Sequence, residues 1–253
     1  MKLGVYQCVA AGRSSQERLA VLEEHLKEQD IDLLVCPELF LSGYNAGPEI
    51  DRLAEPPDGP FGRKMAALAQ RHGCAIAYGY PERGPDRIYN SAALYDAGGA
   101  LLATHRKQMP APGSFEEDVF GRGDGITFAE VCGWRVAMII CYEVEFPEIV
   151  RRAAQGGADL LLVPTALGAD WGVVAEKLVP ARAVENGLYL AYASHAGEEN
   201  GASYFGGSRI AAPDGSDLAV ARQDEVLISA GIIQEMVWKM RERLPYLRDC
   251  KGL

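Results

Sequence analysis

The stretch Gly133-Trp134-Arg135-Val136-Ala137-Met138-Ile139-Ile140-Cys141-Tyr142-Glu143-Val144-Glu145-Phe146-Pro147-Glu148 decides the fold of this chain. It is apolar from Val136 to Ile140, turns acidic within a few residues, and places Pro147 where a helix can begin. The pattern predicts a buried strand, a sharp elbow and a helix start, with Cys141 at the elbow. Nucleophiles often occupy such strand ends, although a lone cysteine there is more often an inert core thiol.

Similar elements are expected on both sides of this stretch. Short apolar runs indicate buried strands, recurring leucines indicate helices, and short glycine-containing turns join three strands that must be antiparallel. Ser14 and Glu17 have the spacing of a capping box, and Gly73 is placed to end a helix. The expected strands are 3–9, 31–36, 74–80, 90–95, 101–105, 136–140, 158–163, 187–193, 204–211, 218–222 and 226–232, and the expected helices are 15–29, a segment ending at 73, 147–155, 171–186 with an interruption at Pro180, and 234–243.

The order of these elements is similar in the two halves of the chain. Two sheets that face each other, with helices on the outside, would bury every apolar face. The sequence therefore predicts an α/β protein, a four-layer α-β-β-α sandwich with two mixed β-sheets. We expect one domain over residues 1–253, with an irregular and functional loop between 108 and 127.

Composition excludes several classes of function. The net charge of -10 argues against nucleic acid and anionic membranes as partners. Six cysteines without metal-ligand spacing suit reduced thiols in a cytoplasmic protein, so no metal site is expected from them. No apolar run reaches the length of about 18 residues that a membrane span needs.

Three chemically useful residues each follow an apolar strand. Glu38 follows 31–36, Lys107 follows 101–105, and Cys141 follows 136–140. Alone, Glu38 is best explained as a turn carboxylate and Cys141 as a core thiol. If the strands share a direction, the three side chains can converge at one end of the sheets, where a carboxylate, an ammonium and a thiol have a coherent catalytic use.

With these residues in place, the chain resembles the nitrilase, or carbon-nitrogen hydrolase, superfamily. Three motifs carry the resemblance in the right order: Leu33-Leu34-Val35-Cys36-Pro37-Glu38, His105-Arg106-Lys107, and Cys141-Tyr142-Glu143-Val144-Glu145-Phe146-Pro147-Glu148. Further matches are Gly123-Asp124, Pro164-Thr165-Ala166, Ala181-Arg182-Ala183-Val184-Glu185-Asn186 and Pro213-Asp214-Gly215. One departure is Glu143, since the family often has aspartate at this position.

The resemblance implies a role for each motif residue. Glu38 would be the general base, Lys107 the ammonium that stabilises the oxyanion, and Cys141 the nucleophile. The family has a further carboxylate on the loop after the lysine, and Glu116 fits that place, with Glu117 as the adjacent alternative.

Other residues are expected around these four. The backbone N–H of Tyr142 would help to bind the oxyanion. Tyr44, Phe115, Thr165 and Trp171 are candidate substrate-binding residues, and each is equally compatible with packing. Glu145 could bind an amine-bearing substrate or simply favour the following helix N-terminus, and the second reading is the better one from sequence.

The function expected from the resemblance is an amidase that cleaves a small carboxamide through a cysteine thioester, and this mechanism needs neither a metal nor an organic cofactor. A nitrilase and an N-carbamoyl amidohydrolase are alternatives within the same chemistry. A catalytically silent binding or scaffold protein of the same fold is the alternative from another class. The family usually associates through the helix after the third motif and the segment after Pro164, so a homodimer or larger homo-oligomer is expected. Neither the substrate nor the stereoselectivity follows from the sequence.

Overall fold

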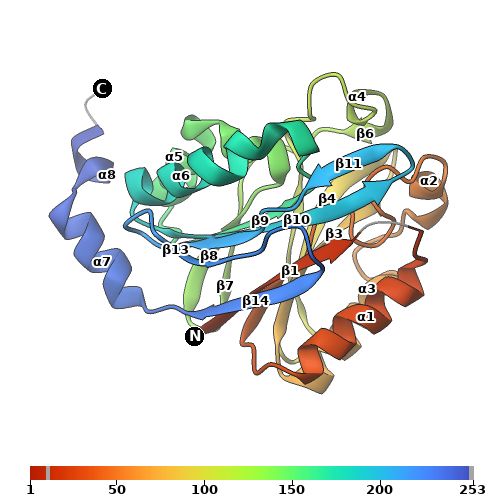
Figure 1. The fold of residues 1–253 in the computed structure, drawn as a ribbon, viewed down its shortest axis with the longest axis horizontal. Coiled ribbons are helices and arrows are strands. Elements are labelled where there is room, and N and C mark those ends of the chain that lie inside the picture. The colour runs from red at the N-terminus through yellow and green to blue at the C-terminus, as the bar shows by residue number, and fades with distance from the viewer. Residues whose placement is uncertain (10–11, 251–253) are drawn as a thin grey trace.

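Two groups of β-strands form the centre of the protein in the computed structural model, which describes residues 1–9 and 12–250. Figure 1 shows them as two layers between helices. The first group has the order β14-β1-β2-β3-β4-β5, and the second has the order β13-β12-β10-β9-β8-β7. The strands of the first group are β1 (Lys2–Val9), β2 (Leu33–Val35), β3 (Ala75–Arg83), β4 (Ile88–Tyr95), β5 (Leu101–Arg106) and β14 (Val226–Gly231). Those of the second are β7 (Thr127–Val131), β8 (Trp134–Met138), β9 (Leu160–Thr165), β10 (Tyr189–Glu199), β12 (Arg209–Ala211) and β13 (Asp217–Val220).

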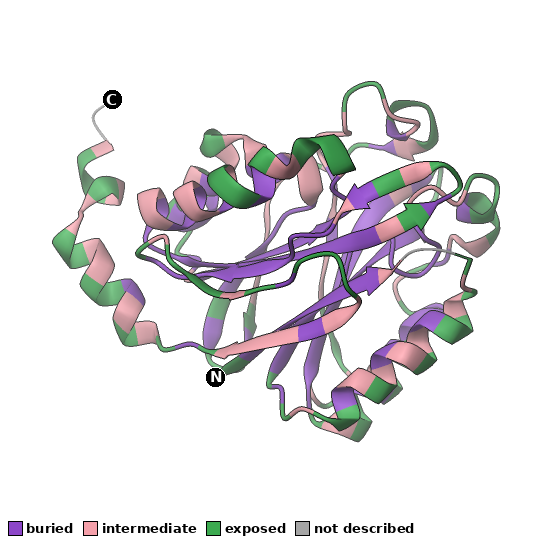
Figure 2. Cartoon of the chain, in the orientation of Figure 1, coloured by how far each residue is buried: buried purple, intermediate pink, exposed green. Residues whose placement is uncertain are grey.

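The two sheets are joined at one place and face each other elsewhere. There the end of β1 pairs in parallel with β10, with Cys8 opposite His195 and Val9 opposite Ala196. Alternate residues of both sheets point inward and pack as one apolar cluster, as the period of two along a strand requires. The cluster includes Leu3, Val35, Ala77, Val136, Met138, Leu162 and Ala191. Figure 2 shows that burial is concentrated in these strands.

Helices cover the outer face of each sheet. The first sheet is covered by α1 (Ser15–Lys27) and α3 (Pro60–His72), and the second by α5 (Pro147–Gln155) and α6 (Val179–Asn186). Local sequence fixes two helix ends: Ser14 and Glu17 form the capping box before α1, and Gly73 ends α3 in a left-handed conformation with φ of 61°. The predicted four-layer α-β-β-α sandwich is confirmed.

Strand direction brings several loops to one end of the molecule. Strands β1, β2 and β3 are parallel, and β5 shares their direction because β4 is antiparallel to both β3 and β5. In the other sheet β8, β9 and β10 are parallel to one another, and β10 is parallel to β1. The carboxyl ends of β2, β5, β8 and β9 therefore point the same way. In Figure 1 the short helix α4 (Glu116–Val119) lies at this end, opposite α7 (Gln234–Arg243) and α8 (Tyr246–Asp249).

Several expected elements differ in the structure. The loop 108–127 holds α4 and β6 (Phe120–Gly121), and a strand β7 follows it; neither α2 (Glu49–Leu53) nor α8 was predicted. The expected strand 204–211 is divided into β11 (Ala202–Phe205) and β12 by two glycines with positive φ, Gly206 and Gly207.

The interruption predicted at Pro180 lies just before it. A π-helical segment, Val174–Leu178, precedes α6, and a 3-10 turn, Ala169–Trp171, precedes that. Pro180 has no N–H for the preceding turn and its ring crowds the carbonyl four residues back, which favours the wider turn. Among the helices that the structure describes, none combines the length and apolar character needed to cross a membrane.

Candidate active site

Glu38 lies just beyond the carboxyl end of β2 and is fully buried. Its backbone N–H donates to the Thr165 carbonyl at 3.4 Å, and its carbonyl accepts from His195 Nε2 at 2.7 Å. The next residue, Leu39, has a φ of 48°, so the chain turns sharply after Glu38. Contacts from β9 and β10 thus fix the backbone that carries this carboxylate.

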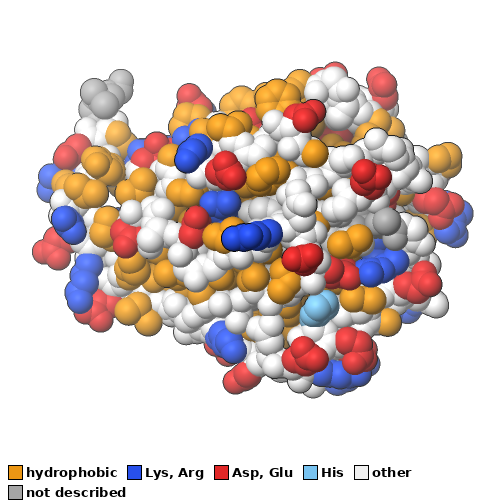
Figure 3. Space-filling model, viewed as in Figure 1, with side chains coloured by type: hydrophobic (Ala, Val, Ile, Leu, Met, Phe, Trp, Pro, Cys, Tyr) orange, Lys and Arg blue, Asp and Glu red, His pale blue; other side chains and the backbone are white. Residues whose placement is uncertain are grey.

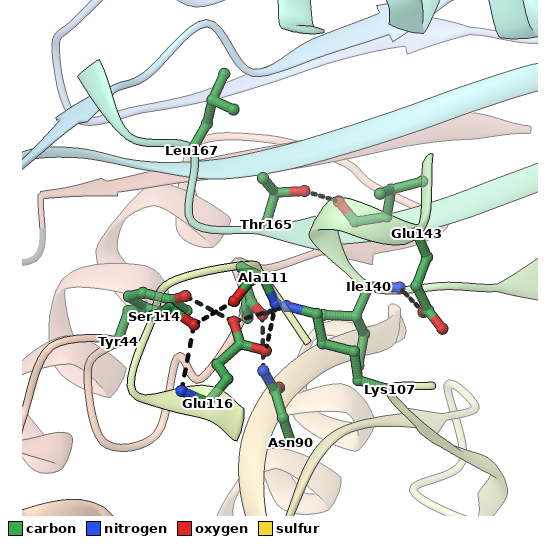
Figure 4. Close-up of polar contacts among 12 residues, drawn as sticks. Tyr44, Asn90, Lys107, Ala111, Ser114, Glu116, Ile140, Glu143, Thr165 and Leu167 are labelled. Atoms are coloured by element: carbon green, nitrogen blue, oxygen red, sulfur yellow. Dashed lines mark hydrogen bonds and ion pairs between the residues drawn. The ribbon is translucent and has the colours of Figure 1, made fainter. Parts of the chain in front are cut away.

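Lys107 joins two buried carboxylates. Its ammonium lies 2.7 Å from Glu38 Oε1 and 2.8 Å from Glu116 Oε1, and all three side chains are almost completely excluded from solvent. Asn90, on β4, donates to the same Glu38 oxygen at 2.7 Å. Figure 4 shows the Lys107 side chain reaching across to Glu116, with Asn90 approaching from another strand. The cluster has two carboxylates and one ammonium in a dry setting.

Glu116 is held by its own loop as well. The Tyr44 hydroxyl donates to Glu116 Oε1 at 2.6 Å, and the Ala111 backbone N–H donates to Oε2 at 3.4 Å. The neighbouring Glu117 is exposed. Of the two adjacent glutamates, Glu116 is therefore the one placed beside Lys107.

Cys141 stands at a sharp turn between β8 and a short 3-10 helix, η1 (Cys141–Glu145), and α5 begins at Pro147. Its φ of 50° is rare for a residue with a side chain, and such strained positions cluster at functional sites. The strand, elbow and helix start predicted from the sequence are all present. Tyr142 is the second residue of η1, where backbone N–H groups have no partner within the turn.

Burial and neighbouring charges shift the pKa values of the three central groups. Burial raises the pKa of the Glu38 carboxyl, and the Lys107 ammonium offsets only part of this. Burial and the Glu38 carboxylate raise the pKa of the Cys141 thiol, with partial relief from Lys107. Burial alone would lower the pKa of Lys107, but Glu38, Cys141 and Glu116 outweigh it and the pKa is raised. A neutral thiol beside a carboxylate of increased proton affinity is suited to general-base activation.

The expected substrate-binding residues fall into two groups. Tyr44 reaches the cluster of Glu38, Lys107 and Glu116 through its hydrogen bond to Glu116, Phe115 packs against Tyr44 with ring centroids 5.2 Å apart, and Thr165 is buried next to the Glu38 backbone. Glu145 is half-buried at the end of η1, and Trp171 is 63% exposed. No hydrogen bond in the described part of the chain joins the last two side chains to Glu38, Lys107 or Glu116.

Two contact residues were missed from sequence. Asn90 lies in the expected strand 90–95, and His195 lies just after the expected strand 187–193; both hydrogen-bond to Glu38, from segments far apart in the sequence. Burial lowers the pKa of His195 to about 4, so it is a neutral imidazole that donates from Nε2. A polar residue within an apolar strand is the only sequence signal for either. Residues 1–9 and 12–250 contain no group of three or more His, Cys, Asp or Glu that could hold a metal.

Sequence comparison relates almost the whole chain to known hydrolases. Residues 3–242 match the family described as carbon-nitrogen hydrolase. A Pseudomonas protegens protein called hydrolase in pqqF 5'region is 44% identical over 98% of this chain and 88% of its own length. An (R)-stereoselective amidase of a Pseudomonas species is 33% identical, over 87% of this chain and 80% of its own.

Solved structures give the same relationship. An amidase from Nesterenkonia sp. AN1 matches with a TM-score of 0.85 and 32% identity, covering 100% of this chain and 97% of the amidase chain. A structure of a variant of that amidase shows the acetamide moiety of fluoroacetamide added covalently to its active-site cysteine, with a TM-score of 0.83, 31% identity, and coverage of 99% and 96% of the two chains.

Proposed function

The chain belongs to the carbon-nitrogen hydrolase family, and we propose that it is an amidase that cleaves a small carboxamide to a carboxylate and ammonia through a thioester on Cys141. The observation that carries the proposal is the buried cluster in which Lys107 bridges Glu38 and Glu116. The cluster lies at the end of the sheets where Cys141 follows β8. The names of the similar amidases support it.

In the acylation half-reaction the Glu38 carboxylate takes the proton from Cys141 Sγ. The resulting thiolate attacks the carbonyl carbon, and the carbonyl electron pair moves to oxygen. Lys107 Nζ and the Tyr142 backbone N–H donate to this oxyanion, which is worth most in a buried site. When the intermediate collapses, the C–N bond breaks, Glu38 returns its proton to the nitrogen, and ammonia leaves.

In the deacylation half-reaction a water molecule replaces ammonia. Glu38 takes its proton as the water oxygen attacks the thioester carbonyl, and the C–S bond then breaks. The proton held by Glu38 returns to the Cys141 sulfur, which restores the resting enzyme. Glu116 keeps the Lys107 ammonium in place through the 2.8 Å ion pair, which is a positioning role.

Substrate binding is proposed for the aromatic pair Tyr44 and Phe115, for Thr165 and Trp171, and for Glu145. The Glu145 side chain makes no hydrogen bond or ion pair with another described residue; Arg182 donates to the Glu145 backbone carbonyl and not to its carboxylate. Burial raises the pKa of the Glu145 carboxyl, which the charges of Arg182 and Lys107 partly offset. A half-buried acid of this kind favours an amide that also carries an amine.

The test of the function is ammonia release from a panel of small amides by the wild type and by Cys141→Ala. The wild type should release ammonia from at least one amide, and Cys141→Ala should retain less than about one part in 10⁴, as for other lost nucleophiles. Equal activity in the variant contradicts the mechanism. Ammonia released from nitriles alone would indicate a nitrilase, and release of carbon dioxide would indicate a carbamoyl substrate. If neither ammonia nor carbon dioxide is released, the protein is a catalytically silent scaffold.

The same panel tests Glu145. An aminoamide should lose about fivefold in kcat/KM in Glu145→Gln while a neutral amide of equal length should not, since one partly exposed ion pair is worth about 1 kcal/mol. Equal changes for both amides contradict the assignment.

A cytoplasmic location is also proposed, consistent with six unpaired cysteines at positions 8, 36, 74, 132, 141 and 250. Cell fractionation tests it.

A further inference from the structure

Glu143 is a fully buried carboxylate that the proposed mechanism does not use. It lies on η1, two residues after Cys141. Figure 4 shows it turned back towards the Ile140 backbone and apart from Glu116. Because an unsatisfied buried charge is costly, its hydrogen-bond partners show what the side chain holds together.

Each Glu143 oxygen accepts from a different pair of groups. Oε2 accepts from the Ile140 backbone N–H at 2.6 Å and lies 2.9 Å from His105 Nε2. Oε1 accepts from the Gln108 backbone N–H at 2.8 Å and from Gln108 Nε2 at 3.2 Å. The carboxylate is therefore shared by three separate residues.

These partners flank the two groups that must meet at the substrate. Ile140 immediately precedes Cys141, whereas His105 and Gln108 stand on either side of Arg106 and Lys107. Lys107 follows β5 of the first sheet and Cys141 follows β8 of the second. Glu143 thus ties together, across the two facing sheets, the segments that carry the ammonium and the thiol.

We propose that Glu143 is a positioning residue that fixes the Cys141 thiol relative to the Lys107 ammonium by holding both of their loops. The catalytic consequence rests on the proposed amidase function. A displacement of either loop by about 1 Å can lower the rate about 100-fold. The hydrogen bonds of Glu143 to both loops therefore affect catalysis as well as folding. Glu143 does not touch the reacting atoms.

The carboxylate state is what allows four donors to be satisfied. Burial on its own would raise the pKa of Glu143, but the interactions with His105 and with the Gln108 and Ile140 backbone N–H groups outweigh burial and lower it. The substitution Glu143→Gln keeps the shape but replaces one acceptor oxygen by an NH₂ group. That NH₂ must face a backbone N–H, either of Gln108 or of Ile140, so one loop is released.

A matched control is available on β3. Glu82 is also buried and bonds to Ser91 and to Arg106, the residue beside Lys107, but it makes no hydrogen bond to the 140–145 segment. Glu82→Gln removes a comparable buried carboxylate and therefore reports the general cost in stability. Two readouts are compared: kcat and KM on the best amide, and the rate at which iodoacetamide alkylates the Cys141 peptide, followed by mass spectrometry.

We expect Glu143→Gln to lower kcat by about 100-fold with KM changed by less than about threefold, and to slow Cys141 alkylation by about tenfold. Glu82→Gln should stay within about twofold of wild type in both readouts. The proposal is overturned if Glu143→Gln matches Glu82→Gln, whether both are active or both are impaired. Thermal unfolding shows that the compared variants are folded.

Two further comparisons keep the result decisive. If Glu143→Gln does not fold, Glu143→Asp and Glu82→Asp replace the pair, because one methylene less withdraws the carboxylate from at least one loop. An equal kcat and alkylation rate in these two aspartate variants overturns the proposal. If the wild type hydrolyses no amide, the proposed function fails, and the alkylation rates alone decide whether Glu143 positions the thiol.

Discussion

At the scale of single residues, the site depends on three ionisable groups whose proton affinities are all raised. The Glu38 carboxyl is buried beside the Lys107 ammonium, and the partly buried Cys141 interacts electrostatically with both. A thiol with an ordinary or raised pKa is not a thiolate at neutral pH, so a base must remove its proton as it attacks. Glu38 is suited to this because burial raises its pKa towards the working pH.

This arrangement predicts a specific acid limb in the pH profile of kcat/KM. In the proposed mechanism Glu38 is a base, which requires its ionised form; burial raises its pKa above the ordinary 4.5, so activity should fall with decreasing pH at a midpoint above 4.5. The pKa of Lys107 is raised above 10.5, so loss of its proton should not limit activity below that value. An acid limb at or below 4.5, with the protein folded by circular dichroism, would contradict the role of Glu38.

The motif residues could be selected from the sequence because each follows an apolar strand in a recognisable motif. The contacts that surround these residues could not be predicted from the sequence. The bonds from Asn90 and Tyr44 depend on how distant segments meet, and so does the tie made by Glu143, which the sequence showed only as a departure from the family pattern. The sequence favoured Glu116 but kept the adjacent Glu117 as an alternative, whereas in the structure only Glu116 of the two is buried.

At the scale of elements, strand direction explains why the site exists at one end of the molecule. The carboxyl ends of β2, β5, β8 and β9 share that end, where Glu38, Lys107 and Cys141 follow β2, β5 and β8 and Thr165 is the last residue of β9. Long periodic helices and apolar strands were predictable. The short elements α2, α4 and β6 were not, because segments of two to five residues are stabilised by tertiary contacts rather than by a local pattern.

We propose that the protein forms a homodimer or larger homo-oligomer, and the 3-10 turn Ala169–Trp171 provides a test of this assembly. Trp171 is 63% exposed and Val173, just after the turn, is 54% exposed, in the segment after Pro164. Large exposed apolar side chains are enriched at interfaces. We expect sedimentation velocity to show an oligomer that Trp171→Glu dissociates.

A tryptophan of similar exposure serves as the control for this prediction. Trp238, on α7, is 59% exposed and lies on a different element. Trp238→Glu should leave the sedimentation coefficient unchanged. A wild-type monomer, or equal dissociation by both substitutions, would contradict the proposed interface.

At the scale of the whole molecule, one apolar core between two facing sheets holds the loops of both sheets in register. The four layers were predictable because the order of elements is similar in the two halves of the chain. A single domain over 1–253 stays a prediction. Figure 3 shows acidic and basic side chains interspersed over the face in view, with no large area of one sign. With a net charge of -10, this surface suits a small neutral or amine-bearing substrate better than a polyanion.

The central claim is that Cys141 carries the acyl group of the substrate during turnover. The most direct measurement mixes the enzyme with its best amide, quenches with acid, and weighs the peptide that contains Cys141, with a parallel reaction in neutral hydroxylamine. We predict an acyl mass on this peptide and formation of the hydroxamate, both absent from Cys141→Ala. Ammonia release without an acylated Cys141 peptide and without hydroxamate would contradict the account.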